Sequence, residues 1–395
     1  MSQYTRYAAT ALLAALAAGC GAPAAAPPPR PAPSAPAAAG GHAGAPQPTE
    51  AKAPFTLVAS GDVLASSPAA LDTAKGDAPA SARRGSGLTG YDYRPMLKGI
   101  KPVIAEADLA LCHLGTPLGP LTGPFTGSGA LQSPPQVATA LKDAGFDSCA
   151  TASGHTLDRG DAGIHSTLEA LDTVGLRHTG SARNAVEGTR PALLRARGGA
   201  EVAHLSYALG NGRAARGAKP WAVSLVDEQR IIADARAARR AGADLVVVSV
   251  AWGTAYRTAP DATQLALART LTAAETDGRP DIDLILGSGA HTPQAYEKVN
   301  GVWVVYGLGD QIAGSMKRPQ GTWGTVARFR FVPPERPGDR WQVTDTEYVP
   351  QLLTRTEPLR TINLNRTKLW VKERAAIGKT VLSRGAAASG LVAGR

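Results

Sequence analysis

Short apolar runs alternate with stretches of helical apolar spacing from residue 54 onward, and this alternation restricts the possible folds more than any other feature of the sequence. It predicts a layered α/β domain with parallel strands. The expected strands are 55–60, 108–113, 146–151, 201–208, 244–250 and 281–287, and the expected helices are 94–107, 134–144, 161–174, 226–241 and 261–275. Hydrophobic residues make up 44% of the chain, so it can bury the core that such a fold needs.

The last part of this region has a different pattern. Asn300-Gly301 separates two β-type runs, which is a strong local signal for a hairpin. The runs 325–332 and 341–349 continue as antiparallel strands. We therefore expect a mixed α/β fold, with parallel βα units first and antiparallel strands last.

Residues 1–20 have the layout of a targeting segment. Arg6 precedes an apolar run that extends from Ala8 to Ala18, and small residues and Cys20 follow. This layout predicts a signal peptide. The residues around Cys20 resemble a bacterial lipobox, in which the cysteine is lipidated and becomes the mature N-terminus. An ordinary secretory signal with an incidental cysteine is the alternative.

Residues 21–53 contain nine Pro and thirteen Ala and almost no charge. Such a segment cannot bury a core, so we expect a semi-extended linker. At about 3.1 Å per residue it would reach roughly 100 Å. We therefore expect an exported protein, either anchored to the cell membrane through lipid on Cys20 or extracellular.

The cysteine count excludes a disulfide framework and a cysteine-based zinc site, because the chain has only three. Cys112 and Cys149 lie in apolar stretches, and we expect them to be buried, unpaired thiols.

The net charge of +10 is unevenly distributed, because residues 356–395 contain eight Lys or Arg and two Asp or Glu. Overall basicity is therefore weak evidence for nucleic-acid binding, and we expect none. We interpret 353–395 as a basic C-terminal tail. Its basic stretch forms either a solvated terminal helix or an amphipathic helix that contacts an anionic polymer or envelope surface.

Polar residues follow the expected strands at their carboxyl ends. Asp62 comes after the first strand, Trp252 follows a later one, and further polar stretches follow His113, Thr151 and Gly287. In α/β sheets the loops at the carboxyl ends of the strands form the ligand site. The topology alone therefore brings these loops together.

These loops carry a known series of motifs. The chain resembles the CapA family, the capsule and poly-γ-glutamate synthesis proteins with a metallophosphatase-like fold, over residues 54–352. The motifs are SGDV (60–63), ADLALCHL (107–114), ASGHTLDRG (152–160), VSVAWG (248–253), LGSGAHTPQ (286–294) and VYGLGD (305–310). The resemblance implies a layered β-sandwich flanked by helices, with two divalent metal ions at its lip. Such a pair of cations, about 3.5–4 Å apart, clamps a phosphoryl-like group and activates a water.

The metal ligands that the resemblance implies are mostly replaced here. Positions where the family has Glu, Asn or His are Gly115, Gly154, Ala251, Ser288 and Gly289. None of these residue types can replace a carboxylate or an imidazole at a metal. The retained ligand-type positions are Asp62, His155 and His291, and Trp252, Gln294 and Asp310 lie near them in the motifs.

The alternative interpretation is that the retained residues have only structural roles in their loops. Asp is frequent at turns, and a lone His is more often a hydrogen-bonded loop residue than a ligand. We expect no catalytic residue and no resident cofactor. At most, Asp62, His155 and His291 form one weak metal site.

The leading hypothesis is a surface-tethered CapA-like protein that binds an anionic capsule or envelope polymer and is not an active enzyme. One alternative is a CapA-type metal-dependent hydrolase that works with a reduced ligand set. The other is a non-catalytic envelope scaffold that recruits partners through its basic tail.

Overall fold

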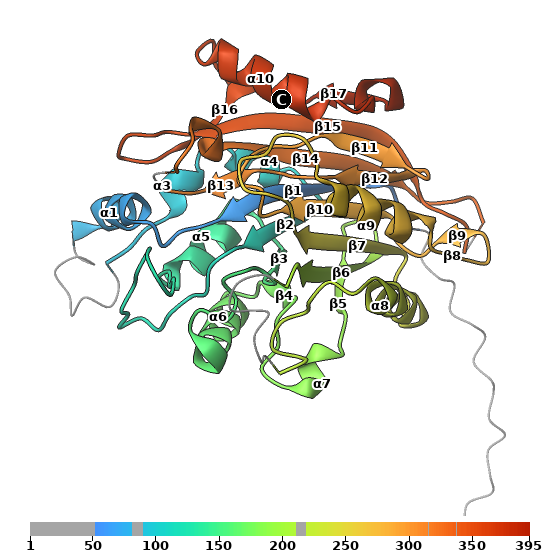
Figure 1. The fold of residues 1–395 in the computed structure, drawn as a ribbon, viewed down its shortest axis with the longest axis horizontal. Coiled ribbons are helices and arrows are strands. Elements are labelled where there is room, and N and C mark those ends of the chain that lie inside the picture. Colours follow the sequence, from blue (N-terminus) through green and yellow to red (C-terminus); the bar gives the residue numbers. More distant parts are fainter. Residues whose placement is uncertain (1–51, 81–89, 211–218, 315, 337) are drawn as a thin grey trace, which may run out of the picture. The chain divides into compact units, whose positions relative to one another are not determined.

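The computed structural model describes residues 52–80, 90–210, 219–314, 316–336 and 338–395. The expected signal peptide 1–20, the lipidation position Cys20 and nearly all of the linker 21–53 lie outside these residues. The described part contains two large sheets that lie face to face, with helices on their outer faces (Figure 1).

The first sheet has nine strands, and β1 (Phe55–Val63) lies at its middle. β1 pairs in parallel with β2 (Leu109–Leu114) on one side and antiparallel with β14 (Trp323–Val332) on the other. The order is β16-β15-β14-β1-β2-β3-β4, with β13 on β1 and β17 on β15. The remaining strands are β3 (Ser148–Ala150), β4 (Arg177–Thr179), β13 (Asp310–Ile312), β15 (Gln342–Leu353), β16 (Thr361–Asn363) and β17 (Leu391–Ala393).

The second sheet has six strands in the order β11-β12-β10-β7-β6-β5. Its central four are parallel, and the two edge strands are antiparallel to their neighbours. The strands are β5 (Ala192–Arg195), β6 (Glu201–Ala208), β7 (Leu245–Ala251), β10 (Leu284–Ser288), β11 (Tyr296–Val299) and β12 (Val302–Val305). A separate hairpin consists of β8 (Glu275–Thr276) and β9 (Arg279–Pro280).

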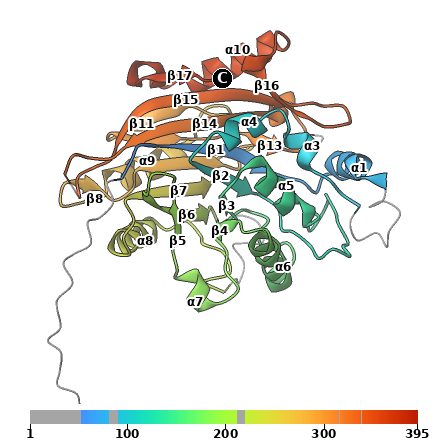
Figure 2. The same cartoon turned by 180° about the vertical axis from the view of Figure 1, so that it is seen from behind.

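Helices cover the outer faces of both sheets, as the views from in front and from behind show (Figure 2). α5 and α6 pack on the first sheet, while α8 and α9 pack on the second. The helices are α1 (Pro68–Asp77), α3 (Arg94–Leu97), α4 (Lys101–Ala105), α5 (Gln136–Ala144), α6 (Gly160–Thr173), α7 (Ala185–Gly188), α8 (Glu228–Arg240), α9 (Ala262–Ala273) and α10 (Val371–Val381). Short 3-10 turns span Pro319–Thr322, Leu364–Arg366 and Ala386–Ser389.

Alternate residues of the central strands face different cores. Leu57 of β1 contributes to the core between the sheets, while Val58 faces the helices. A strand that is buried on both faces has a nearly continuous apolar sequence, which is why these strands stood out in the sequence. The expectation of a layered, mixed α/β fold flanked by helices is confirmed.

One expected helix is interrupted. The stretch 94–107 forms two short helices, α3 and α4, because Pro102 near the start of α4 has no N–H with which to continue the hydrogen bonds of α3. Gly99 between them lies directly against β16, where a Cβ atom would lie 1.9 Å from the carbonyl oxygen of Thr361. The apolar spacing was correct, but the proline interrupts the helix. No helix among the described residues is long and apolar enough to cross a membrane.

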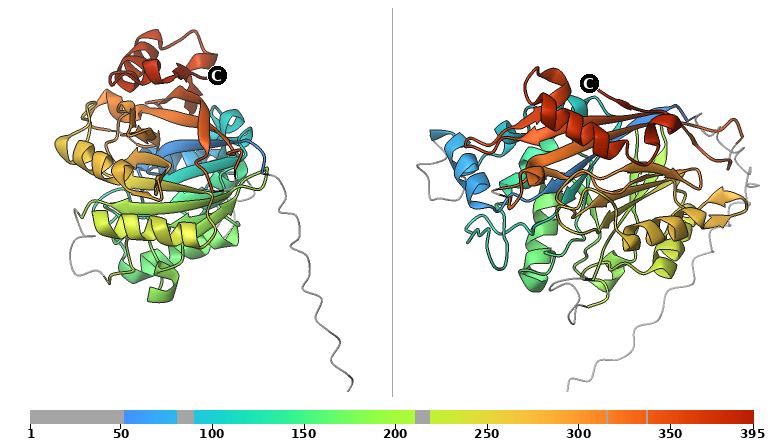
Figure 3. Two further views of the ribbon diagram at one scale, coloured as in Figure 1. Left: turned by 90° about the vertical axis from the view of Figure 1, so that its right-hand side faces the viewer. Right: turned by 45° about the horizontal axis from the view of Figure 1, so that its top comes forward.

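The segment 353–395, which we expected to be a tail, is part of the fold. β16 pairs antiparallel with β15, and β17 pairs with β15 in parallel. α10 lies across β15 (Figure 3), and its buried Ile377 and Val381 join the core that lies between the sheets. The basic charge is therefore carried by an ordered surface that the sheet holds in place.

The expectation for the cysteines was wrong. Cys112 of β2 and Cys149 of β3 form a disulfide, with their Cα atoms 4.5 Å apart. The parallel register places the two residues directly opposite each other. Burial was predicted correctly, but the pairing of two neighbouring strands in this register could not be read from the spacing of the cysteines.

Candidate functional site

Asp62 lies near the end of β1, between two other polar strand residues. The register places it opposite His113 of β2 on one side and opposite Asp310 of β13 on the other. Its backbone N–H donates to the carbonyl oxygen of Gly309 at 2.9 Å. The side chain is almost completely buried, with Asp62 only 1% exposed. Strand pairing thus brings three residues together that are far apart in the sequence.

Protein groups engage both carboxylate oxygens of Asp62. Oδ1 contacts Nδ1 of His113, and Oδ2 accepts the backbone N–H of Gly289 at 2.8 Å. Nε2 of His113 lies 3.0 Å from the carbonyl oxygen of Ala152. Both ring nitrogens of His113 therefore face acceptors, which requires both to carry protons. Burial lowers the pKa of His113, but the Asp62 carboxylate outweighs burial and raises it; in return, the charge on His113 holds the pKa of Asp62 below its usual value in spite of burial.

His291 completes the group from the loop after β10. Its Nδ1 lies 3.1 Å from Oδ1 of Asp310 and 3.9 Å from Oδ2 of Asp62. Burial lowers the pKa of His291, but the two carboxylates overcome burial and raise it to about 9. Burial, reinforced by the neighbouring Asp62, raises the pKa of Asp310 to about 7.

We call Asp62, His113, His291 and Asp310 the Asp62 cluster. It sets two imidazole rings against two carboxyl groups, so the negative charge of the carboxylates is offset within the protein. Within the part of the chain that the structure describes, one group has the geometry to hold a metal ion: Asp62, His291 and Asp310, whose ligand atoms lie within 4.8 Å of one another.

His155 does not belong to that group. Its Nδ1 lies 2.9 Å from Oδ2 of Asp158, and its side chain is 44% exposed. The same Asp158 oxygen accepts the N–H of Leu131 at 2.8 Å, so this pair fastens two loops together. We expected His155 to complete a residual metal site with Asp62 and His291. Among the described residues, the ligand atoms that lie together are instead those of Asp62, His291 and Asp310, because β13 pairs with the end of β1.

Two further predicted pocket residues have structural partners. The indole N–H of Trp252 donates to the carbonyl oxygen of Tyr306 at 2.8 Å. Gln294 is fully buried; its side-chain oxygen accepts from Gln264 at 2.7 Å, and its amide donates to the carbonyl oxygen of Arg257 at 2.8 Å. Both side chains hold the loops around the Asp62 cluster, so their polar atoms already have hydrogen-bond partners.

The replaced positions lie at or after strand ends, and at one of them, Gly289, the backbone disfavours a side chain. Gly289, which contacts Asp62, has a φ of +85° that side chains rarely adopt. A Cβ atom at Gly115 would lie 2.6 Å from a methyl group at the end of the flexible Leu64 side chain, which a small rotation of that side chain would relieve. Ser288 is buried at the end of β10, opposite Ala251 of β7. Gly154 lies in the turn that follows β3.

His113 is the residue that the sequence did not single out. It ends an apolar strand, and the family motif drew attention to the missing carboxylate at Gly115, two residues later. A lone histidine at the carboxyl end of a parallel strand next to the strand of Asp62 was the available signal.

The family described as "Bacterial capsule synthesis protein PGA_cap" matches residues 56–315. The chain belongs to this family. The match includes all four residues of the Asp62 cluster, and it confirms the CapA resemblance seen in the motifs.

Two curated relatives are similar to this chain. It is 27% identical over 184 residues to "Capsule biosynthesis protein CapA" of Bacillus anthracis, which covers 46% of this chain and 43% of the relative. It is 26% identical over 180 residues to "PGA biosynthesis protein CapA" of Bacillus subtilis (strain 168), which covers 46% of each. The alignment thus spans less than half the length of these relatives.

Solved structures with some similarity include the NAD nucleotidase NadN of Haemophilus influenzae, at 10% identity over 86% of this chain and 57% of that chain, with a TM-score of 0.43. Another is the calcineurin-like phosphoesterase YfkN of Bacillus subtilis, at 13% identity over 83% of this chain and 97% of that chain, also with a TM-score of 0.43.

Proposed function

We propose that this PGA_cap family protein serves capsule or envelope polymer synthesis by binding polymer, without two-metal hydrolysis. One observation carries the proposal: both oxygens of the Asp62 carboxylate are engaged by protein donors, His113 and the N–H of Gly289. An imidazolium ring thus provides the positive charge that a cation would otherwise provide. Family membership and the named relatives support the link to a capsule polymer.

A pair of cations does not fit this donor set. Two doubly charged ions about 4 Å apart repel by on the order of 16 kcal/mol at an effective dielectric near 20, so a two-metal site needs several carboxylates. The Asp62 cluster offers two carboxyl groups, which already face imidazolium rings. Gly115, Ala251 and Gly289 add no ligand atoms from their side chains.

The test is metal analysis and hydrolysis with the full chain. We expect no stoichiometric metal ion and no cleavage of bis(p-nitrophenyl) phosphate above buffer with Mn²⁺ or Zn²⁺. Metal-dependent turnover that disappears in His291→Ala but persists in the loop variant His155→Ala would refute the proposal.

A second candidate, hydrolysis with a single metal ion, is favoured by one specific observation. Oδ2 of Asp310 is buried and has no hydrogen-bond partner among the described residues. Asp62, His291 and Asp310 would hold one divalent cation, which would lower the pKa of a bound water. In that arrangement His113 and the N–H of Gly289 orient the Asp62 carboxylate toward the ion.

Asp310→Asn separates the two candidates. If one cation is resident, this variant loses a stoichiometric metal ion that wild type and His155→Ala retain. If our main proposal holds, wild type carries no stoichiometric metal, and the variant changes only the ion pair with His291.

The location of the protein is part of the proposal. We infer that lipid on Cys20 and the linker 21–53 place the domain outside the cell membrane. Cys20→Ser would then move the protein from the membrane fraction to the soluble or secreted fraction. Unchanged fractionation together with an unlipidated Cys20 by mass spectrometry would contradict this inference.

A further inference from the structure

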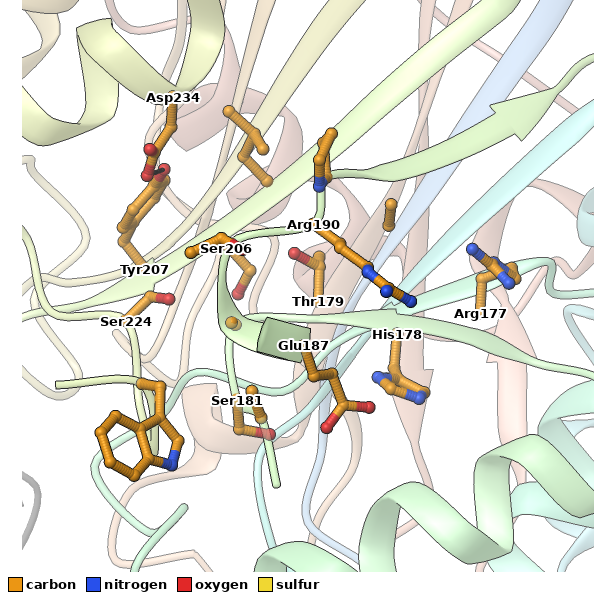
Figure 4. A pocket seen from close by; sticks show the side chains of 18 of the residues that line it. Arg177, His178, Thr179, Ser181, Glu187, Arg190, Ser206, Tyr207, Ser224 and Asp234 are labelled. Carbon is orange, nitrogen blue, oxygen red and sulfur yellow. Dashed lines mark hydrogen bonds between the residues drawn. The ribbon is translucent and has the colours of Figure 1, made fainter. Parts of the chain in front are cut away.

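A second polar site lies where the edge of the first sheet meets the second sheet. The cavity has a volume of about 260 Å³ and is bounded by β4, β5, β6, α7 and α8. Figure 4 shows Arg177 and Arg190 on one side of it and Tyr207 and Asp234 on the other. We call this cavity the Arg177–Arg190 pocket. None of its lining residues belongs to the Asp62 cluster.

The acidic groups of this pocket all have partners. Arg183 forms an ion pair with Asp172 at 2.9 Å and with Glu187 at 2.5 Å. Asp234 accepts the hydroxyl proton of Tyr207 at 2.8 Å. Arg183 offsets one of the two charges of Asp172 and Glu187, and Arg230, 3.5 Å from Asp234, offsets the third carboxylate, so about one negative charge remains in the wall.

The remaining cations have no such partners. Within the described residues, the guanidinium groups of Arg177 and Arg190 take part in no ion pair, although both line the pocket. They are exposed at its rim, where they can meet a ligand from solvent. A guanidinium presents a planar fork of donors that matches a carboxylate or a phosphate.

A buried hydroxyl adds an independent observation. Ser206 lines the pocket from β6, is only 3% exposed, and its Oγ has no hydrogen-bond partner among the described residues. A buried hydroxyl without a partner in the wall of a cavity is available to donate to a ligand or water oxygen. The half-buried indole of Trp221 supplies a flat apolar surface in the same wall.

We propose that the Arg177–Arg190 pocket binds a small polar ligand, or one unit of a polymer, that carries a carboxylate or a phosphate. Arg177 and Arg190 hold the anionic group, Ser206 donates to one of its oxygens or to a neighbouring hydroxyl, and Trp221 covers an apolar face. The volume of about 260 Å³ lies below the roughly 300–1,000 Å³ of drug-sized ligand sites, so it accommodates one such unit.

The experiment is a binding titration of the full chain, followed by heteronuclear NMR or calorimetry. The probes share one skeleton and differ in charge: glycerate carries a carboxylate, glycerol phosphate carries a phosphate, and glycerol is neutral. Glucuronate tests a larger carboxylate. We expect saturable binding of at least one anion and none of glycerol, and the preferred anion identifies which acidic group the pocket takes.

Matched variants assign the binding to this pocket. Arg177→Gln and Arg190→Gln should each weaken the affinity about ten- to a hundredfold, the usual effect of losing a hydrogen bond to a charged group. Ser206→Ala should weaken it less. Arg240→Gln removes an exposed charge at the end of α8, outside the pocket, and should leave the affinity unchanged.

The proposal fails if no anion saturates wild type, if glycerol binds equally well, or if Arg240→Gln weakens binding as much as the pocket variants do. These results do not depend on metal content or turnover, so they are distinguishable from failure of the proposed function.

Discussion

The Asp62 cluster and the Arg177–Arg190 pocket differ in how their charges are matched. In the cluster, each carboxyl group faces an imidazole ring of the same protein. In the pocket, the carboxylates have partners but two guanidinium groups and one buried hydroxyl do not. A site whose charges neutralise each other attracts a charged ligand weakly, whereas an unpaired charge beside a cavity attracts it more strongly. Our proposals therefore place the determinants of ligand binding away from the position where the family motifs meet.

The largest expected effect in testing this difference is that of removing the Asp62 carboxylate. Asp62→Ala leaves the ring of His113 buried without its partner, and breaking a buried pair in this way costs about 3–5 kcal/mol in the free energy of unfolding. Urea denaturation measures it. Asp345→Ala is the control, because that side chain is 67% exposed and its pair with Arg330 contributes little. A small effect of Asp62→Ala would mean that the cluster is not a self-neutralised unit.

The pH dependence of stability tests the charge on the cluster. The pKa of His291 is about 9 in the folded protein, above its unfolded value of about 6.5. Its contribution is therefore fully present below pH 6.5 and is lost as the pH rises through 9. Above pH 7, where Asp310 has released its proton, we expect a loss on the order of 2 kcal/mol.

Urea midpoints at closely spaced pH values measure this loss. His291→Gln should flatten the profile over the same range. A wild-type profile that is already flat between pH 7 and 9 would contradict the assignment.

Restoring one lost ligand tests whether the scaffold still has room for metal. We expect Gly289→His to lower stability by about 1–3 kcal/mol, because the backbone there has a φ of +85° and a Cβ atom would lie 3.2 Å from the carbonyl oxygen of Trp252. Gly242→His is the matched control for the φ penalty, since its φ is +100° and nothing lies within 4 Å of its Cβ position. Thermal melting of both variants should show the larger loss at Gly289. If Gly289→His instead gains a bound metal ion without loss of stability, the cluster is an intact metal site.

The smallest expected effect is that of a chelator. A bound metal stabilises the folded state by mass action, so its removal lowers the melting temperature. We expect EDTA to leave the melting temperature of wild type unchanged, while a saturating anion that binds the Arg177–Arg190 pocket raises it. If EDTA instead lowers the melting temperature and no anion raises it, the Asp62 cluster is the ligand-binding region and the pocket is not.

Most of the fold could be predicted because its signals are local. Apolar runs marked the central strands, and Asn300-Gly301 marked the hairpin between β11 and β12. The short strands β13, β16 and β17 were missed. Each has three residues and exists through its pairing with a neighbour, so periodicity has too few positions to detect it.

The site was predicted less completely for the same reason. Asp62 and His291 were found from motifs, and Asp310 was placed near them. The pairing of β1 with both β2 and β13 sets His113 and Asp310 against Asp62, and such a register is invisible in a single sequence. His155 lies apart because Asp158, three residues later, binds its ring. The Arg177–Arg190 pocket combines residues of several elements and carries no motif.

The central position of β1 has a consequence for how the chain reaches its folded state. Phe55 at the start of this strand lies opposite Phe331 of β14. The middle of the first sheet therefore forms only when residues from nearly opposite ends of the folded sequence pair. Contacts between residues so distant in sequence slow folding and leave strand edges exposed meanwhile. During synthesis, β1 has no antiparallel partner until β14 has emerged. Until then, the backbone groups on that side of β1 stay open to pairing with other chains.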